Sequence, residues 1–127
     1  MVHRVLRWER ASRTRVELTL LDGPAMRRLN RRAKGRRNLT DVIAFSLPQP
    51  DGSVVGDVYI CPEAARRYVA RNGSRESAAV RHELIRLAVH GTLHVLGFDH
   101  PDGPGRMRSA MWRRQERYVR RLLGGKI

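Results

Sequence analysis

The sequence predicts a small α+β fold, in which a mixed β-sheet of about four strands has helices packed against one or both of its faces. Short runs of strand-forming residues alternate with longer helical patterns, in the order strand, helix, strand, strand, helix, helix, helix. At 127 residues the chain is large enough for one hydrophobic core and too small for two. We therefore expect a single domain over residues 1–127.

The N-terminal third predicts a helix, a strand and a second helix. Residues 1–14 are basic and carry an apolar stripe, which indicates a short helix leading into a strand. Residues 16–21 alternate and are rich in strand formers. The turn Asp22-Gly23-Pro24 supplies an N-cap and a proline for a helix over residues 24–33, with Met26 and Leu29 facing inward.

The middle of the chain predicts a loop and two strands. Residues 34–38 are basic, contain a glycine and show no apolar period, so we expect an exposed loop. Residues 42–47 are typical of a largely buried strand. The turn at residues 48–52 leads into a further strand over residues 54–60.

Three helices are expected in the C-terminal half. Pro62 suits the first position of a helix that ends near residue 73, and Ser74 is expected to cap the long, histidine-bearing helix that follows. After a loop over residues 98–104, a last helix is expected from about residue 105 to residue 123. Its inward-facing residues are expected to be Met107, Met111, Tyr118 and Leu122.

The composition points to a polyanionic partner. The chain has 26 Lys and Arg against 12 Asp and Glu, a net charge of +14, and nearly all the cations are arginine. Arginine suits bidentate phosphate contact, so a nucleic acid is the expected partner. The codon usage of a GC-rich genome would explain arginine in place of lysine, but it does not explain the excess over acids.

Cysteine usage and the N-terminus indicate a cytoplasmic protein. Cys61 is the single cysteine, so no disulfide partner is expected, and it should pack as a small apolar residue. The first eight residues lack the apolar core of a signal peptide, and no apolar run approaches the roughly 20 residues that span a bilayer. We expect no membrane association.

Three of the five histidines, His90, His94 and His100, fall within eleven residues. Positions i and i+4 of a helix face the same way, so His90 and His94 form a two-ligand clamp. Gly97 is typical of a left-handed helix end, which would turn the chain and bring in His100. Three imidazoles with an open fourth position are typical of catalytic zinc, so we expect one Zn²⁺ per chain on a metalloprotease-like zinc helix in the core. Nickel or another borderline metal would use the same ligands.

The spacing His-x3-His-x5-His matches the zinc frame of the metzincin proteases except at one position. Those enzymes carry a general-base glutamate after the first histidine, where this chain has Gly91, so proteolysis is disfavoured. Zinc beside a basic surface fits phosphodiester cleavage instead. Asp99 either accepts a hydrogen bond from an imidazole N–H and so orients that ring, or caps its loop. Glu83, two helical turns before His90, is expected in a surface ion pair.

Three segments resemble one family. The stretch from His90 to His100 is similar to the H-G-x-L-H-L-x-G-Y-D-H signature of the YbeY-type ribosomal RNA maturation factors. Leu29–Arg31 and Thr40–Ser46 resemble the family's L-N-R and T-D-V-L-S-F elements, and Gly56–Ile60 resembles its G-D-I-x-I strand. The likeness runs from about residue 16 to the last helix, and the part before it, residues 1–14, is short relative to the family.

The resemblance implies a bacterial, zinc-dependent, single-strand-specific endoribonuclease that acts in 3′-end maturation of small-subunit rRNA and in ribosome quality control. The implied partners are single-stranded RNA, rRNA, and the small ribosomal subunit or its proteins. His90, His94 and His100 match the family's metal ligands and are the implied catalytic residues. Family members also carry an arginine for RNA binding and cleavage, at the position held here by Lys34. Either Lys34 suffices, or Arg36 or Arg37 has taken over.

Two alternatives stay open. One is a non-catalytic ribosome-assembly factor with a structural zinc, whose basic face binds rRNA or a ribosomal protein. The other, less favoured because of Gly91, is a metalloprotease.

Overall fold

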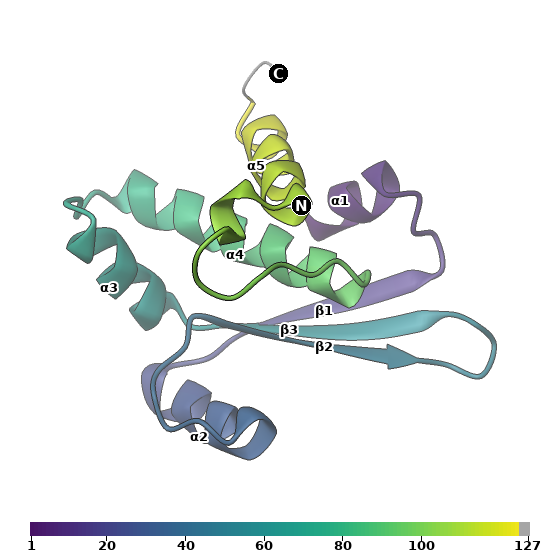
Figure 1. Cartoon of the computed structure of the whole chain (residues 1–127), viewed down its shortest axis with the longest axis horizontal. Coiled ribbons are helices and arrows are strands. Elements are labelled where there is room, and N and C mark those ends of the chain that lie inside the picture. Colours follow the sequence, from purple (N-terminus) through teal and green to yellow (C-terminus); the bar gives the residue numbers. More distant parts are fainter. Residues whose placement is uncertain (125–127) are drawn as a thin grey trace.

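The computed structural model describes residues 1–124 and confirms an α+β fold (Figure 1). In this part of the chain the sheet has three strands, where the sequence predicted about four. The apolar positions before residue 14 follow a helical period and form a helix, so they add no strand. The elements are α1 (Val2–Trp8), β1 (Thr14–Leu20), α2 (Gly23–Lys34), β2 (Val42–Pro48), β3 (Val54–Ile60), α3 (Pro62–Arg71), α4 (Ser77–Val95), the 3₁₀ turn η1 (Arg106–Arg108) and α5 (Ala110–Leu122).

The sheet is mixed, with strand order β1-β3-β2. β1 runs parallel to β3, and β2 pairs with β3 as an antiparallel hairpin. β2 is therefore an edge strand, and its second half is exposed, with Leu47 at 52%. The prediction of a largely buried strand there was wrong, because a run of apolar residues does not tell an edge strand from a central one.

Helices cover both faces of the sheet. α4 lies against one face, with α1 and α5 packed on α4, and α2 lies on the opposite face of the sheet (Figure 1). Val58 and Ile60 of β3 pack with Leu87 and Ala88 of α4. On the other side Met26 of α2 packs with Cys61 and its neighbours, and Cys61 is fully buried, as its apolar role predicted.

Two glycines bring α4 unusually close to β3. A Cβ added to Gly91 would lie 2.5 Å from Cγ1 of Val58, and a Cβ added to Gly56 would collide with Val95. The two contacts are reciprocal, since each strand or helix offers a glycine to a valine of the other. This close packing holds the histidine-bearing helix against the sheet.

Two helix starts differ from the predictions. α4 begins at Ser77, and Glu76 is its N-cap residue. The Ser74 hydroxyl accepts a hydrogen bond from the Glu76 N–H, in the turn that precedes the helix. The last helix begins at Ala110, because Ser109 caps it by accepting from the Trp112 N–H. Met107 consequently lies in η1 and is 62% exposed, so its predicted inward role was wrong.

The other helix predictions hold. Asp22 caps α2 by accepting from the Ala25 N–H at 2.8 Å, and Met111 and Tyr118 of α5 are buried as expected. Within residues 1–124, none of the helices has the length and apolar character needed to cross a membrane.

Candidate metal centre

The C-terminal end of α4 brings three histidines together. His90 and His94 lie one turn apart on the helix, and the helix ends at Val95. Gly97 has a φ of 99°, in the left-handed region, and its N–H bonds to the His94 carbonyl. The chain reverses there, as the glycine predicted, and His100 returns to the helix end.

The three Nε2 atoms form a nearly equilateral triangle. The His90–His94 separation is 3.1 Å, and both separations to His100 are 3.3 Å. We searched the described residues for groups of three or more histidine, cysteine or carboxylate side chains that are close enough to hold a metal ion. This trio is the group found. The structure thus places the three predicted ligands around one point.

The opposite ring nitrogens explain why the three Nε2 atoms are available. Each Nδ1 faces an oxygen that can only accept: the Gln115 side-chain oxygen at 2.6 Å from His90, the Phe98 carbonyl at 3.0 Å from His94, and the Pro101 carbonyl at 3.0 Å from His100. Each Nδ1 therefore carries the hydrogen, and each Nε2 directs a lone pair inward. Three lone pairs that point at one another repel, and a cation bound between them would offset this repulsion.

Burial keeps two of the rings neutral. It lowers the pKa of His90 to about 4, helped by the charges of His94 and Arg106 and opposed by the hydrogen bond that His90 donates to Gln115. The pKa of His94 is lowered as well, mainly by burial and then by the nearby His100. At neutral pH these rings are in the unprotonated form that binds a metal.

Gln115 is a site residue that the sequence interpretation missed. It lies on α5, is 1% exposed, and is fixed by donating its amide hydrogen to Glu116 at 3.0 Å while its oxygen faces His90. Its position four residues after Met111 and three before Tyr118 places it on the apolar face of the helix. A single polar residue on an otherwise apolar helix face was the signal in the sequence that could have identified Gln115.

The three predicted RNA-binding residues lie at different places. Lys34, the last residue of α2, lines a groove of about 290 Å³ together with His90, His94 and the edge strand β2. Arg37 lines a separate hollow formed with Arg27, Arg28 and Arg31. Arg36 is exposed in the loop between α2 and β2 and lines neither.

The two acidic candidates also lie apart from the imidazoles. Asp99 accepts a hydrogen bond from the backbone N–H of His100 at 2.8 Å, which holds the loop. Glu83 does form an ion pair, with Arg86 at 2.9 Å, but its side chain is only 8% exposed, so this is not a surface pair. Arg106, from η1, was not predicted at all, and its charge acts on both His90 and His94.

Comparisons with known proteins agree with this geometry. A family model described as Endoribonuclease YbeY matches residues 1–123. Endoribonuclease YbeY of Mycolicibacterium smegmatis is 35% identical over 98 residues, covering 68% of this chain and 53% of that protein. That of Mycobacterium leprae is 32% identical over 117 residues, covering 82% and 64%. That of an Anaeromyxobacter species is 40% identical over 87 residues, covering 67% and 43%.

A solved structure is similar over nearly the whole chain. The solution structure of TM1509 from Thermotoga maritima superposes with a TM-score of 0.66 at 27% identity, covering 97% of this chain and 77% of that one. The chain spans about half the length of the curated relatives that it matches. The family model, the relatives and the histidine motif together show that this chain belongs to the YbeY endoribonuclease family.

Proposed function

We propose that this chain is a zinc-dependent endoribonuclease that cleaves single-stranded RNA. The triangle of Nε2 atoms is the observation that carries the proposal. Four tetrahedral ligands at the usual Zn–N distance of about 2.0–2.1 Å lie about 3.3–3.4 Å from one another. The separations of 3.1 to 3.3 Å between His90, His94 and His100 fit that ligand set, and the names of the relatives support the reaction class.

The catalytic roles follow from where the residues lie. His90, His94 and His100 would hold the zinc, which when bound supplies a water of lowered pKa and a Lewis acid for a phosphoryl oxygen. Lys34, which lines the same groove as His90 and His94, would hold the phosphate of the bound strand. Arg36 and Arg37 would contact RNA further along, beyond the groove.

Gly91 supports RNA over peptide as the substrate. The metzincin glutamate would have to occupy this position, and Val58 fills the space next to it. A side chain at position 91 would overlap Val58 unless Val58 or α4 moved, and with glycine there the chain lacks that general base. This contact weighs against the metalloprotease alternative.

We further propose that the substrate is ribosomal RNA and that the protein acts in the cytoplasm. The proposed tasks are 3′-end maturation of small-subunit rRNA and ribosome quality control, with the small subunit or its proteins as partners. The net charge of +14 supports a polyanionic partner of this kind. Co-sedimentation with purified small subunits tests the partner, and accumulation of 3′-extended rRNA in a deficient strain tests the task.

The central experiment combines metal analysis with RNA cleavage. Purified protein should contain one zinc per chain and cleave a single-stranded oligoribonucleotide, and a chelator or His94→Ala should abolish both properties. His82→Ala is the matched control, because His82 lies exposed on the same helix away from the trio. Chelator-insensitive cleavage, or full activity in His94→Ala, would rule out the mechanism.

The same variants separate catalysis from a purely structural zinc. If His90→Ala binds small subunits normally and restores growth of a deficient strain, the chain is a non-catalytic assembly factor. If zinc-loaded protein cleaves casein and spares RNA, it is a protease. Either result would replace the proposed function.

A further inference from the structure

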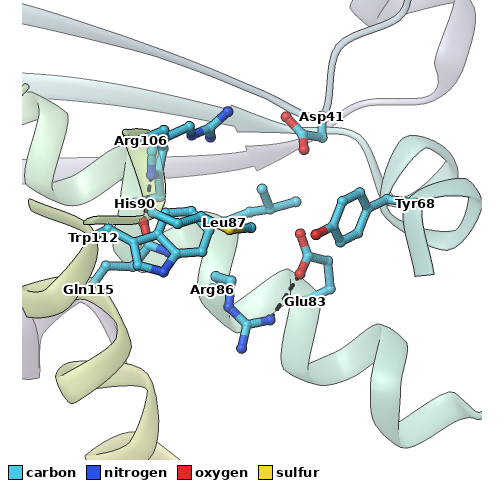
Figure 2. Close-up of a pocket in the computed structure, with 10 residues that line it drawn as sticks. Asp41, Tyr68, Glu83, Arg86, Leu87, His90, Arg106, Trp112 and Gln115 are labelled. Carbon is cyan, nitrogen blue, oxygen red and sulfur yellow. Dashed lines mark hydrogen bonds and ion pairs between the residues drawn. The ribbon is translucent and has the colours of Figure 1, made fainter. Parts of the chain in front are cut away.

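A hollow of about 160 Å³ lies directly beside His90 (Figure 2), and Lys34, which lines the groove that also contains His90, is not among its lining residues. Leu87 and Trp112 give it apolar walls, and Asp41, Glu83 and Arg106 bring charged groups to it. Figure 2 shows the carboxylates of Asp41 and Glu83 directed into the same space, with Arg106 entering from the side of His90. The proposed reaction gives this hollow no role so far.

The size and walls of the hollow suit one planar ring. A protein cavity of about 150 Å³ holds a benzene ring, and pockets for larger ligands run from about 300 Å³ upward. The Trp112 side chain offers an aromatic surface, with the Arg106 guanidinium 5.8 Å from its centroid. A pyrimidine base matches these dimensions better than a two-ring purine.

The acceptors in the hollow are short of donors. The Asp41 carboxyl has no hydrogen bond or ion pair with another side chain of the described residues, and its partners are the backbone N–H groups of Asp41 and Val42 and the more distant charge of Arg106. Glu83 accepts one hydrogen bond from Arg86, at one of its two oxygens, while Nε and the other terminal nitrogen of Arg86 donate to Glu116. Burial raises the pKa of the Asp41 carboxyl and that of Glu83, which means that each anion lacks solvation that a donor could replace.

The charges decide which part of an RNA strand can enter. Two carboxylates repel a phosphate, so the phosphate stays outside the hollow, with the metal site and Lys34. A base amino group is a donor that carboxylates accept, as Asp and Glu accept from the N4 amino group of cytosine. Uracil has a carbonyl oxygen at that position and would face the carboxylates with a lone pair. Arg106 can donate to the acceptors on the rest of the ring.

We propose that this hollow is a base-specificity pocket that binds a cytosine of the RNA strand next to the phosphate at the metal site. Asp41 is the specificity-determining residue, and Glu83 and Arg106 complete the polar contacts. Asp41 is well placed for this, because its carbonyl accepts the Cys61 N–H at 2.9 Å and so holds the residue at the start of β2. The proposal rests on the proposed function, since it assigns that site its sequence preference.

The test measures cleavage of unstructured oligouridylates that carry a single cytidine, adenosine or guanosine. Cleavage next to cytidine should exceed cleavage next to uridine by about tenfold or more in kcat/KM. Asp41→Asn should reduce this ratio at least tenfold, because the asparagine amide can donate to the uracil oxygen. Glu17→Gln, which removes one exposed carboxylate elsewhere, should leave the ratio unchanged. Equal cleavage, or a preference for uridine or a purine, in the wild-type protein would overturn the pocket, whether or not the variants fold.

A binding experiment keeps this proposal separate from the catalytic one. If no RNA is cleaved at all, the proposed function fails, and titration of the zinc-loaded protein with CMP and UMP still tests the pocket by NMR. Tighter binding of CMP, lost in Asp41→Asn, would support it. Equal or tighter binding of UMP would overturn it.

Discussion

At the level of one residue, His90 illustrates how the fold orients a proposed metal ligand. Its ring is buried, its pKa is lowered to about 4 mainly by that burial, and its Nδ1–H is held by Gln115 at 2.6 Å. Burial makes the ring neutral and the hydrogen bond selects the tautomer, so Nε2 is ready to bind before any metal arrives. In His94 and His100 the Nδ1 atoms face backbone carbonyls instead, which no side-chain substitution can remove.

Gln115 is therefore the positioning residue that mutation can test. Gln115→Leu keeps the volume and removes the acceptor, so we expect zinc affinity to fall about 10- to 100-fold. Competition with a fluorescent chelator measures the affinity. Gln49→Leu, at an exposed position in the hairpin turn, should leave it unchanged. An unaltered affinity in Gln115→Leu would show that the hydrogen bond does not orient His90.

At the level of elements, α4 is the helix on which the site depends, and it is held from two sides. On one side the glycine–valine contacts press it against β3. On the other side Arg86 donates from α4 to both carboxylate oxygens of Glu116 on α5, at 2.8 and 3.1 Å. Each contact supports a separate prediction.

Gly91→Ala tests the contact with the sheet. Alanine favours a helix over glycine by about 1 kcal/mol, but the added methyl would overlap Val58. Because overpacking costs about 1–3 kcal/mol, we expect a net loss of up to about 2 kcal/mol in the free energy of unfolding, measured by urea denaturation. Combining it with Val58→Ala should relieve the overlap, so the double variant should lose less than the sum of the two. Strict additivity would contradict the close contact.

Glu116→Gln tests the contact with α5 through its pH dependence. Burial raises the pKa of Glu116, but the hydrogen bonds from Arg86 and Gln115 outweigh it and leave the pKa below its ordinary 4.5. The ionised carboxylate therefore stabilises the fold above pH 4.5 and loses this effect as the pH falls through the folded-state pKa. We expect the variant to lose about 1.5–3 kcal/mol of unfolding free energy at pH 7.

The difference in unfolding free energy between wild type and Glu116→Gln should become smaller below pH 4.5. Urea denaturation with chelator present measures it, so that release of metal at low pH does not enter. Glu17→Gln, at an exposed position on β1, should show no such trend. A difference that stays constant down to pH 3 would contradict the linkage.

At the level of the whole molecule, the net charge of +14 is spread unevenly. Arg27, Arg28, Arg31 and Arg37 line one hollow, and none of them has an ion pair within residues 1–124. Arg13, by contrast, lies 3.6 Å from Asp51. The unpaired arginines extend the positive surface from the groove of Lys34 along α2, so a bound strand can follow it.

RNA binding should accordingly be steeply salt-dependent. For single strands the slope of log K against log salt changes by about 0.7 for each phosphate contact. Arg37→Ala should lower the slope by about that amount, measured by fluorescence anisotropy with a 12-nucleotide RNA, without changing the zinc content. Arg13→Ala should have a smaller effect, because Asp51 already offsets its charge. Equal slopes in both variants would exclude Arg37 from the RNA path.

Local spacing was enough to predict the fold class, most element positions and the three histidines. The ligands fall within one helix and the turn after it, so the helical period and Gly97 dictate their convergence without distant contacts. The same holds for the Asp22 cap and for the helix after Pro62. The predictions of about four strands and of a largely buried β2 were wrong, because strand pairing and edge position depend on the order of the strands in space.

Tertiary packing alone decided what surrounds the histidines. Gln115 and Arg106 come from beyond the histidine motif, and Asp41 comes from the start of β2, so no spacing within one segment relates them to His90. Lys34 was found through a family pattern, but its place in the same groove as His90 and His94 follows from α2 ending beside β2. The physical reason is that a helical period specifies contacts only over a few residues, whereas the hollow beside His90 and its charges depend on how α4, α5 and the sheet pack against one another.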